Sequence, residues 1–266
     1  MKHLLYIFVL LSLFSCQKEN RNEEEKPPVV ETPPPPPAAG AVCKVSTVRE
    51  YPAIEGNNIV RTFTYDDKNR VVKVDVQSGT TTVTRTINYN TDGRIGNISN
   101  SNGFTEKFTY TGTVLTTWEA VDAAGKPVKK STFTYEGSQL QREDRHVYNA
   151  TASAYQLADY MTFEWDANGN ITAIKTFGAD NVLKATDTYT YDTTKENKQQ
   201  TITPQMNLMF MNWSNDITAF INSKHLLSGV VSKKRTMVYQ TNEAGLITHV
   251  KNNKGEDLFA FTYGCN

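Results

Sequence analysis

A short motif that ends in tyrosine or tryptophan recurs along most of the chain and constrains the fold more than any other feature. The first copy, Phe63-Thr-Tyr65, is followed by a turn rich in Asp and Asn and then by a second apolar stretch. Related tripeptides end at Tyr89, Tyr110, Tyr135, Trp165, Tyr191, Tyr239 and Tyr263, at steps of 24, 21, 25, 30, 26, 48 and 24 residues. The step of 48 residues is two periods, so a repeat near 24 residues is the unit of the fold.

Apolar and polar residues alternate within each repeat, as they do in a half-buried strand. Val83, Arg85, Ile87 and Tyr89 share one face of such a strand. Turn residues flank the strands at 66–69, 90–93, 166–169 and 242–245, and at 78–79, 102–103, 122–125, 178–181 and 253–255. The sequence predicts an all-β domain: an antiparallel meander of about eight hairpin repeats that runs up and down about sixteen times and forms a curled or closed sheet. Arg85 and Lys73 are expected in strands, as solvated or edge charges.

One repeat is replaced by a helical insert at about 204–227. Apolar residues there fall at steps of 3, 1, 3, 4, 3 and 1, at Met206, Met209, Phe210, Trp213, Ile217, Phe220 and Ile221. Thr203 is placed to cap the helix and Pro204 suits its first turn, while Ser214-Asn-Asp216 could divide it and Gly229 is expected to end it. Such a stripe favours a plug in the core of the sheet, and a lid over a ligand groove is the alternative.

The N-terminal residues indicate export. A short basic start precedes an apolar run from Leu4 to Phe14, which is too short to cross a bilayer as a helix. The following Leu13-Phe-Ser-Cys16 resembles a bacterial lipobox, which implies a signal peptide at 1–15 and a lipid on Cys16. The alternative is an ordinary secretory peptide with an incidental Cys16. Lipid chains anchor a protein because each buried methylene contributes about 0.8 kcal/mol.

The segment 16–41 is expected to form a stalk. Seven of the ten prolines lie between Pro27 and Pro37, after a run of three glutamates. In a polyproline II conformation, with about 3.1 Å per residue, such a segment lifts a domain by up to roughly 75 Å. Gln17-Lys-Glu19 is similar to the export signal of Bacteroidetes surface lipoproteins. This resemblance implies the outer membrane and favours the cell surface over the periplasmic leaflet.

Two further cysteines bracket the domain that is predicted at 42–266. Cys43 and Cys265 stand at its two ends, and in an oxidising compartment they are expected to join the first and last strands. Closing a loop of about 220 residues stabilises a fold by up to roughly 5 kcal/mol in the chain-entropy model. The alternative is two free thiols.

The repeat itself resembles the YD repeat of RHS-type proteins. That repeat reads Tyr-Asp-x-x-Gly-Arg-apolar, and its best copies here are Tyr89-Asn-Thr-Asp-Gly-Arg-Ile95 and Tyr65-Asp-Asp-Lys-Asn-Arg-Val71. The match covers about 57–266 and is similar in particular to Bacteroidetes lipoproteins with a YD-like domain of unknown function. RHS-type repeats form shells around toxins. About eight units are too few for such a shell, and no further domain follows Tyr263-Gly-Cys-Asn266, so a toxin shell is not expected.

Candidate chemistry is sparse. The four histidines, His3, His146, His225 and His249, have no metal-ligand spacing, so no metal and no cofactor are predicted. Asp166–Asn170 starts like a calcium loop but lacks the later glutamate, so a hairpin turn is predicted. Glu143 and Asp144 would form a catalytic pair only by accident of the fold.

We therefore predict a non-catalytic binding or structural module rather than an enzyme. The chain has 28 basic and 28 acidic residues, so no nucleic acid partner is expected. The expected partners are the membrane, through the lipid anchor, and a glycan or an envelope protein. The repeated aromatic residues are either a stacking platform for such a partner or the filling of the sheet. A secreted hydrolase and a remnant of an RHS-type shell are the alternatives.

Overall fold

The computed structural model describes residues 43–51, 58–197 and 215–265. All of them belong to one compact unit, residues 36–266. The predicted signal peptide, Cys16 and the predicted stalk lie outside the described residues, so they stay predictions.

The described residues form seventeen strands and one helix. In chain order these are β1 (Cys43–Glu50), β2 (Ile59–Tyr65), β3 (Val71–Ser78), β4 (Thr81–Tyr89), β5 (Ile95–Asn100), β6 (Thr105–Thr111), β7 (Val114–Val121), β8 (Pro127–Glu136), β9 (Gln139–Asn149), β10 (Ala154–Trp165), β11 (Ile171–Gly178), β12 (Leu183–Glu196), α4 (Asn215–Asn222), β13 (His225–Val230), β14 (Arg235–Thr236), β15 (Val238–Thr241), β16 (Ile247–Lys251) and β17 (Asp257–Cys265).

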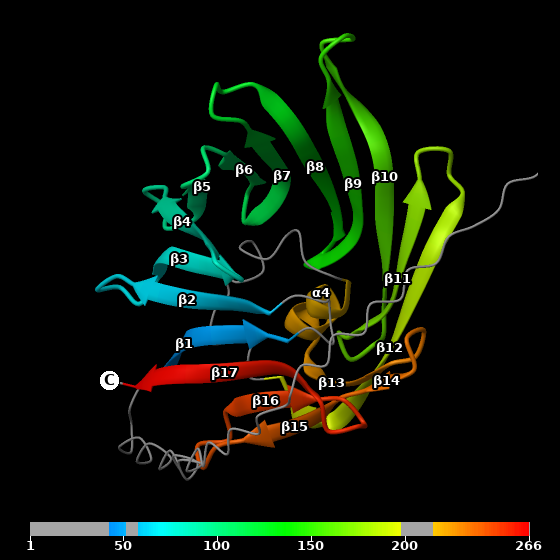
Figure 1. Cartoon of the computed structure of the whole chain (residues 1–266). Helices are drawn as coiled ribbons and strands as arrows, with labels where there is room; N and C mark the ends of the chain where they lie inside the picture. Colours follow the sequence, from blue (N-terminus) through cyan, green and yellow to red (C-terminus); the bar gives the residue numbers. More distant parts are fainter. Residues whose placement is uncertain (1–42, 52–57, 198–214, 266) are drawn as a thin grey trace, which may run out of the picture. The chain divides into compact units, whose positions relative to one another are not determined.

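Each strand pairs in an antiparallel manner with the strands that precede and follow it, from β1 through β14 and from β15 through β17 (Figure 1). This confirms the predicted antiparallel meander. The pairing is local because short turns join most consecutive strands, and such turns allow only antiparallel neighbours.

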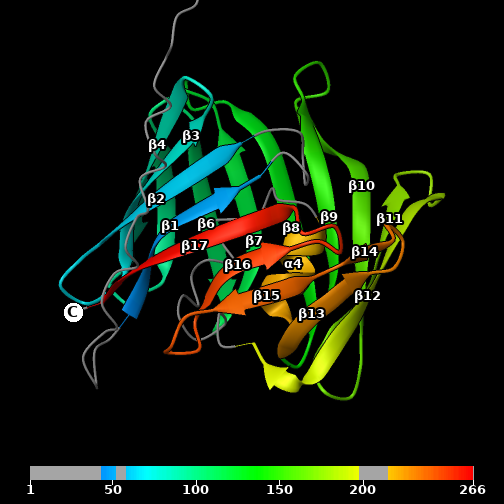
Figure 2. The same cartoon turned by 60° about the horizontal axis from the view of Figure 1, so that its bottom comes forward.

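The first and last strands close the sheet on itself. β1 pairs with β17 as well as with β2, so the two ends of the meander lie side by side (Figure 2). Cys43 is the register partner of Cys265, and the two form a disulfide with their Cα atoms 4.0 Å apart. The bridge expected from the positions of these cysteines is therefore confirmed.

One seam remains in the sheet, between β13 and β15. β14 pairs with β13 and β15 pairs with β16, and Met237 joins β14 to β15. The Met237 N–H donates to the Ser228 carbonyl at 2.9 Å, and within the described residues no ladder pair joins β13 to β15 beyond that point. β14 and β15 thus follow each other directly, and the chain changes its pairing partner from β13 to β16 at Met237. The sheet is nearly closed, with one unsealed seam.

The concave, inner face of the sheet carries the core. Apolar side chains at equivalent positions of successive strands are at most 8% exposed, among them Phe63, Ile87, Phe108, Phe163, Tyr189, Met237 and Phe261. Burying each such side chain contributes about 1.5–3 kcal/mol. One repeat adds one layer of this core, so no repeat is stable without its neighbours.

The helical insert was predicted in the right region, but its end was placed too late. α4 ends at Asn222, and His225–Val230 form β13, so Gly229 lies in a strand rather than at the end of a helix. The reason is that Leu226 and Leu227 pair with β12, which satisfies their backbone groups in the sheet. Residues 203–214 lie outside the described residues.

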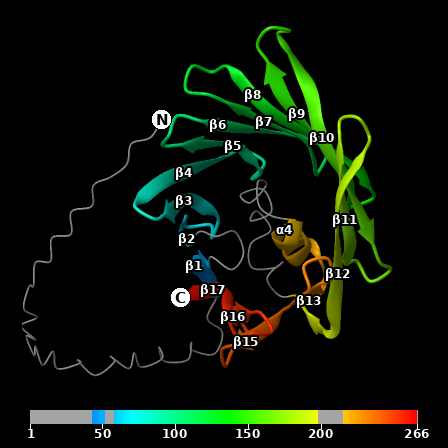
Figure 3. The same cartoon turned by 45° about the vertical axis from the view of Figure 1, so that its right-hand side comes forward.

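α4 packs against the inner face of the sheet near β11, β12 and β13 (Figure 3). Ala219 is fully buried and Phe220 is 7% exposed. The Phe220 ring is stacked on Tyr239, with 6.2 Å between the centroids. Asn197 donates hydrogen bonds to the Phe220 and Ser223 carbonyls, which ties the end of the helix to β12. The described part of the insert is a core element, as the plug interpretation predicts.

Candidate functional site

In six of the eight copies of the motif, the tyrosine or tryptophan donates a hydrogen bond to a backbone carbonyl that precedes it in the chain, in most cases one in the preceding copy. The Tyr89 hydroxyl donates to the Val71 carbonyl at 2.8 Å, and the Tyr65 hydroxyl donates to the Val45 carbonyl at 2.7 Å. The same bond joins Tyr191 to Ile171, Tyr263 to Ile247, Tyr239 to Leu227, and the Trp165 indole to Leu140. Burial raises the pKa of Tyr65 and of Tyr89 to about 12, so both hydroxyls remain donors at physiological pH.

The arginine of the repeat also acts between repeats. The Arg70 guanidinium lies 4.3 Å from the centroid of the Tyr89 ring, and that of Arg94 lies 4.7 Å from the Tyr110 ring. Arg70 is in turn paired with Asp66 at 2.8 Å. Backbone and side-chain hydrogen bonds from Arg70 hold the pKa of Asp66 below its usual range. The conspicuous residues of the motif are therefore used to hold the sheet together.

These contacts decide between the two interpretations of the aromatic rows. Tyr65, Tyr89, Tyr110, Trp165, Tyr191, Tyr239 and Tyr263 are partly buried residues that pack against the core. Because most of their polar atoms are bonded to backbone carbonyls, the rows are the filling of the sheet and not a stacking platform.

Beside the apolar layer, the inner face carries a layer of charged and polar residues. Arg61 pairs with Glu50 at 2.9 Å, and their side chains are 7% and 1% exposed. Arg85 pairs with Glu106 at 2.7 Å. The expectation that Arg85 is a solvated or edge charge is therefore wrong, because Arg85 shares the inner face with Ile87 and meets a carboxylate two strands away. Lys73 is 44% exposed and pairs with Asp75, as expected of a solvated charge.

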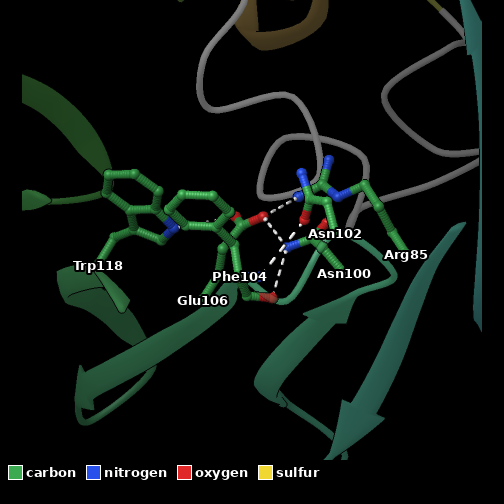
Figure 4. A network of polar contacts seen from close by, with 6 residues as sticks. All are labelled: Arg85, Asn100, Asn102, Phe104, Glu106 and Trp118. Atoms are coloured by element: carbon green, nitrogen blue, oxygen red, sulfur yellow. Dashed lines mark hydrogen bonds and ion pairs between the residues drawn. The ribbon is translucent and has the colours of Figure 1, made fainter. Parts of the chain in front are cut away.

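Glu106 is the centre of one polar network (Figure 4). Its carboxylate accepts hydrogen bonds from Arg85 at 2.7 Å, from the Asn100 amide at 3.2 Å and from the Trp118 indole at 3.1 Å. Glu106 is 8% exposed. A buried carboxylate is tolerated only with such donors, so the network fixes the positions of β4, β5, β6 and β7 relative to one another.

This network leads to the turn Asn100–Phe104, which we call the Phe104 turn. The Asn100 N–H donates to the Phe104 carbonyl at 2.8 Å, and the Gly103 N–H donates to the Asn100 carbonyl at 2.9 Å. Gly103 has φ of 91°, and a Cβ there would lie 2.7 Å from the Cβ of Ala123. Phe104 is 39% exposed. The turn is thus tightly held while it presents an aromatic ring to solvent.

Glu143 and Asp144 do not form a pair. Neighbouring residues of a strand point to opposite faces. Glu143 is 7% exposed on the inner face and accepts a hydrogen bond from Ser131 at 2.7 Å, whereas Asp144 pairs with Arg142 at 2.6 Å. Burial raises the pKa of Glu143. Arg145, also on β9, forms an ion pair with Asp159 of the neighbouring strand β10.

His225 and the calcium-like loop have structural surroundings, His146 and His249 lie in β9 and β16, and His3 lies outside the described residues. The Asp166 carboxylate accepts N–H groups of Asn168 and Asn170 at 2.9 Å each, as expected of a hairpin turn. His225 contacts Asn170 through its backbone N–H and its ring. In residues 43–51, 58–197 and 215–265, no group of three or more His, Cys, Asp or Glu side chains is arranged to hold a metal ion.

A pocket of about 280 Å³ lies beside the seam. It is lined by Thr194, Lys195, Glu196, Leu226, Thr241, Gly245, Leu246 and Ile247. None of these residues was a candidate from the sequence.

No helix in the described part of the chain combines the length and the apolar character needed to span a membrane.

The comparison with solved structures supports the fold. A porin-like protein from Bacteroides uniformis is similar over 87% of this chain and 99% of its own, with a TM-score of 0.56 and 15% identity. A porin-like protein from Bacteroides vulgatus covers 83% of this chain and 98% of its own, with a TM-score of 0.42 and 11% identity. The Photorhabdus luminescens Tc holotoxin pore covers 77% of this chain and 12% of its own, with a TM-score of 0.25 and 14% identity.

No protein-family model and no curated protein matches the chain. The likenesses with TM-scores of 0.42 and 0.25 are too weak to establish a shared fold. The chain therefore shares its fold with the Bacteroides uniformis protein, and this likeness shows the fold alone.

Proposed function

We propose that this protein is a lipid-anchored module of the bacterial outer membrane, displayed at the cell surface, that binds a glycan or an envelope protein without catalysis. The proposal rests on how the side chains of the repeat motif are used in the fold. The tyrosines, arginines and turn carboxylates that recur in the sequence are bonded to one another or to the backbone. A partner can therefore contact the exposed turns and the exposed strand faces of each repeat.

Two further observations support a structural or binding role in the envelope. The disulfide between Cys43 and Cys265 suits an oxidising compartment. The Bacteroides uniformis protein that shares the fold is described as porin-like, which is consistent with an envelope location.

Anchoring is tested by metabolic labelling with palmitate. The wild-type chain should take up the label and partition into the detergent phase, and Cys16→Ala should do neither. Uptake by Cys16→Ala would refute the anchor. Protease treatment of intact cells should then degrade the protein if it faces outward and spare it if it faces the periplasm.

Binding without catalysis is tested with the full-length protein in detergent. It should retain an envelope glycan or protein in a pull-down, and it should turn over no glycosidic, ester or peptide substrate. Turnover that is lost when one carboxylate or histidine is substituted would refute the proposal and favour a hydrolase.

A further inference from the structure

The unsealed seam of the sheet widens into an opening between β13 and β15, which we call the seam opening. The last backbone bond across the seam runs from the Met237 N–H to the Ser228 carbonyl at 2.9 Å. Beyond it, β13 pairs with β12 and β15 pairs with β16, so the two strands run apart (Figure 2). The Tyr239 hydroxyl donates to the Leu227 carbonyl across the seam. This bond holds the two strands at a fixed separation.

β15 presents an unpaired edge to the seam opening. The Asn242 N–H donates to the Leu246 carbonyl at 2.9 Å, so Asn242 faces β16, whereas Met237 faces β13. Backbone groups alternate in direction along a strand, so those of Tyr239 and Thr241 point away from β16 and into the seam opening. In residues 43–51, 58–197 and 215–265, these backbone groups have no hydrogen-bond partner across the seam. The strand also lacks the charged residues and prolines that usually protect an exposed edge.

The pocket beside the seam lies at the end of this edge. Thr241 lines it together with Leu226 and Ile247, which are 6% and 4% exposed. Its volume of about 280 Å³ is below the roughly 300–1,000 Å³ of pockets that enclose small-molecule ligands. A cavity of roughly 150 Å³ holds one benzene ring. The pocket therefore has room for one or two apolar side chains and not for a whole ligand of that kind.

An extended peptide is complementary to both the edge and the pocket. Its backbone donors and acceptors can pair with the edge of β15, and because its side chains alternate between two faces, one of them can enter the pocket. The charges beside the pocket favour a basic peptide. Glu196 lines the pocket and forms no ion pair with the described part of the chain, whereas Lys195 is already paired with Asp192 at 3.1 Å.

We propose that the seam opening is a docking site for an extended segment of a partner protein. The segment adds a strand to the edge of β15, one of its apolar side chains fills the pocket, and a basic residue lies beside Glu196. The inference rests on the proposed function, because it names a protein as the partner of that binding module and gives the site where the partner binds.

The first test uses the full-length protein in detergent and isothermal titration calorimetry. The probes are the synthetic peptides acetyl-Lys-Thr-Val-X-Val-Thr-amide, in which X is Ala, Leu, Phe or Asp. The Leu or the Phe peptide should bind at least about tenfold more tightly than the Asp peptide, because the pocket is lined by Leu226, Leu246 and Ile247. Replacing the Lys of the peptide by Glu should weaken binding severalfold, and Glu196→Gln should remove this difference.

A second series of peptides tests whether the ligand binds as a strand. N-methylation of one backbone nitrogen removes one donor and leaves every side chain unchanged. A strand that is bonded along one edge should lose affinity when every second nitrogen is methylated and should keep it at the positions between. Binding through a side chain alone would show no alternation.

The edge itself is tested with two variants of one residue. Thr241→Pro removes the N–H that faces the seam opening and should weaken binding of the Leu peptide at least about tenfold. Thr241→Val is the matched control, because it keeps this N–H, and it should bind the peptide as the wild type does. Proline is tolerated at a strand edge where the N–H has no partner, so both variants should unfold at the same temperature. If Thr241→Pro is unstable, the methylated peptides still decide with the wild type.

Four results would overturn the site: none of the peptides binds, the Asp peptide binds as tightly as the Leu peptide, methylation shows no alternation, or the Lys and Glu peptides bind equally. The proposed function fails separately. If no peptide binds but a defined envelope glycan is retained, the module stands and the docking site in the seam does not.

Discussion

The Tyr89 hydroxyl donates a hydrogen bond of 2.8 Å to the Val71 carbonyl, and this bond joins the copy of the motif that begins at Tyr89 to the copy that begins at Tyr65. The carbonyl belongs to the residue that follows Arg70, whose guanidinium covers the Tyr89 ring. The spacing of the motif therefore has a structural cause: the tyrosine of one copy and the arginine of the preceding copy meet at the same end of neighbouring strands.

Tyr89→Phe should lower the free energy of unfolding by about 1 kcal/mol, because it removes a buried hydrogen bond and leaves the Val71 carbonyl without its partner. Tyr110→Phe is the matched control. The Tyr110 hydroxyl is buried and has no hydrogen-bond partner in the described part of the chain, so its removal should cost nothing. Urea denaturation of both variants measures the difference. Equal losses would show that the inter-repeat bond does not stabilise the sheet.

Cys43→Ser with Cys265→Ser should lower the free energy of unfolding by about 2–5 kcal/mol, because the bridge closes a loop with a sequence separation of 222 residues. Thermal unfolding with and without a reductant measures the effect. The wild type should lose stability on reduction, and the double variant should not respond. A wild-type midpoint that reduction leaves unchanged would contradict the prediction.

Glu143→Gln should stabilise the protein at neutral pH relative to the wild type. Burial raises the folded-state pKa of Glu143 above its unfolded value. The contribution of Glu143 to the free energy of unfolding is therefore fully present below the unfolded pKa, about 4.3. It is lost as the pH rises through the folded pKa. Glutamine stays uncharged at every pH and can keep the contact with Ser131.

Unfolding measured from pH 4 to pH 8 tests this pH dependence, and the advantage of Glu143→Gln should grow with pH. Glu164→Gln is the control, because that side chain is 50% exposed and solvent screens its charge. An advantage that is constant or falls with pH would show that burial does not raise the pKa of Glu143.

Gly103→Ala should destabilise the protein by about 1–3 kcal/mol more than Gly245→Ala. Both glycines have positive φ, 91° and 76°, but a Cβ at Gly103 would meet Ala123 at 2.7 Å, whereas nothing lies within 4 Å of a Cβ at Gly245. Chemical denaturation measures both variants. Adding Ala123→Gly to Gly103→Ala should restore most of the lost stability. If it does not, the contact with Ala123 is relieved in another way.

The sequence by itself determined the strands, the turns and the meeting of the first strand with the last, but it left open whether the sheet is curled or closed. A tyrosine about every 24 residues and Asp or Asn turns between alternating stretches predict hairpins, because these are local signals. The positions of Cys43 and Cys265 at the two ends of the domain predicted that its first and last strands meet. The face of the sheet on which a side chain lies also follows from a period of two. In the sequence, Arg85 alternates in phase with Ile87 and Tyr89. That signal pointed to the inner face, but the sequence could not name a partner for the guanidinium.

Only the tertiary structure decided which residues meet across the sheet. Arg85 pairs with Glu106 because β4 and β6 both flank β5, and this registers side chains 21 residues apart. The end of the helical insert was missed because Leu226 and Leu227 fit a helical stripe as well as a strand, and pairing with β12 decides between them. The exposure of Phe104 likewise depends on where the sheet curves, since alternation places a side chain on a face and only the assembled fold sets how much solvent reaches it.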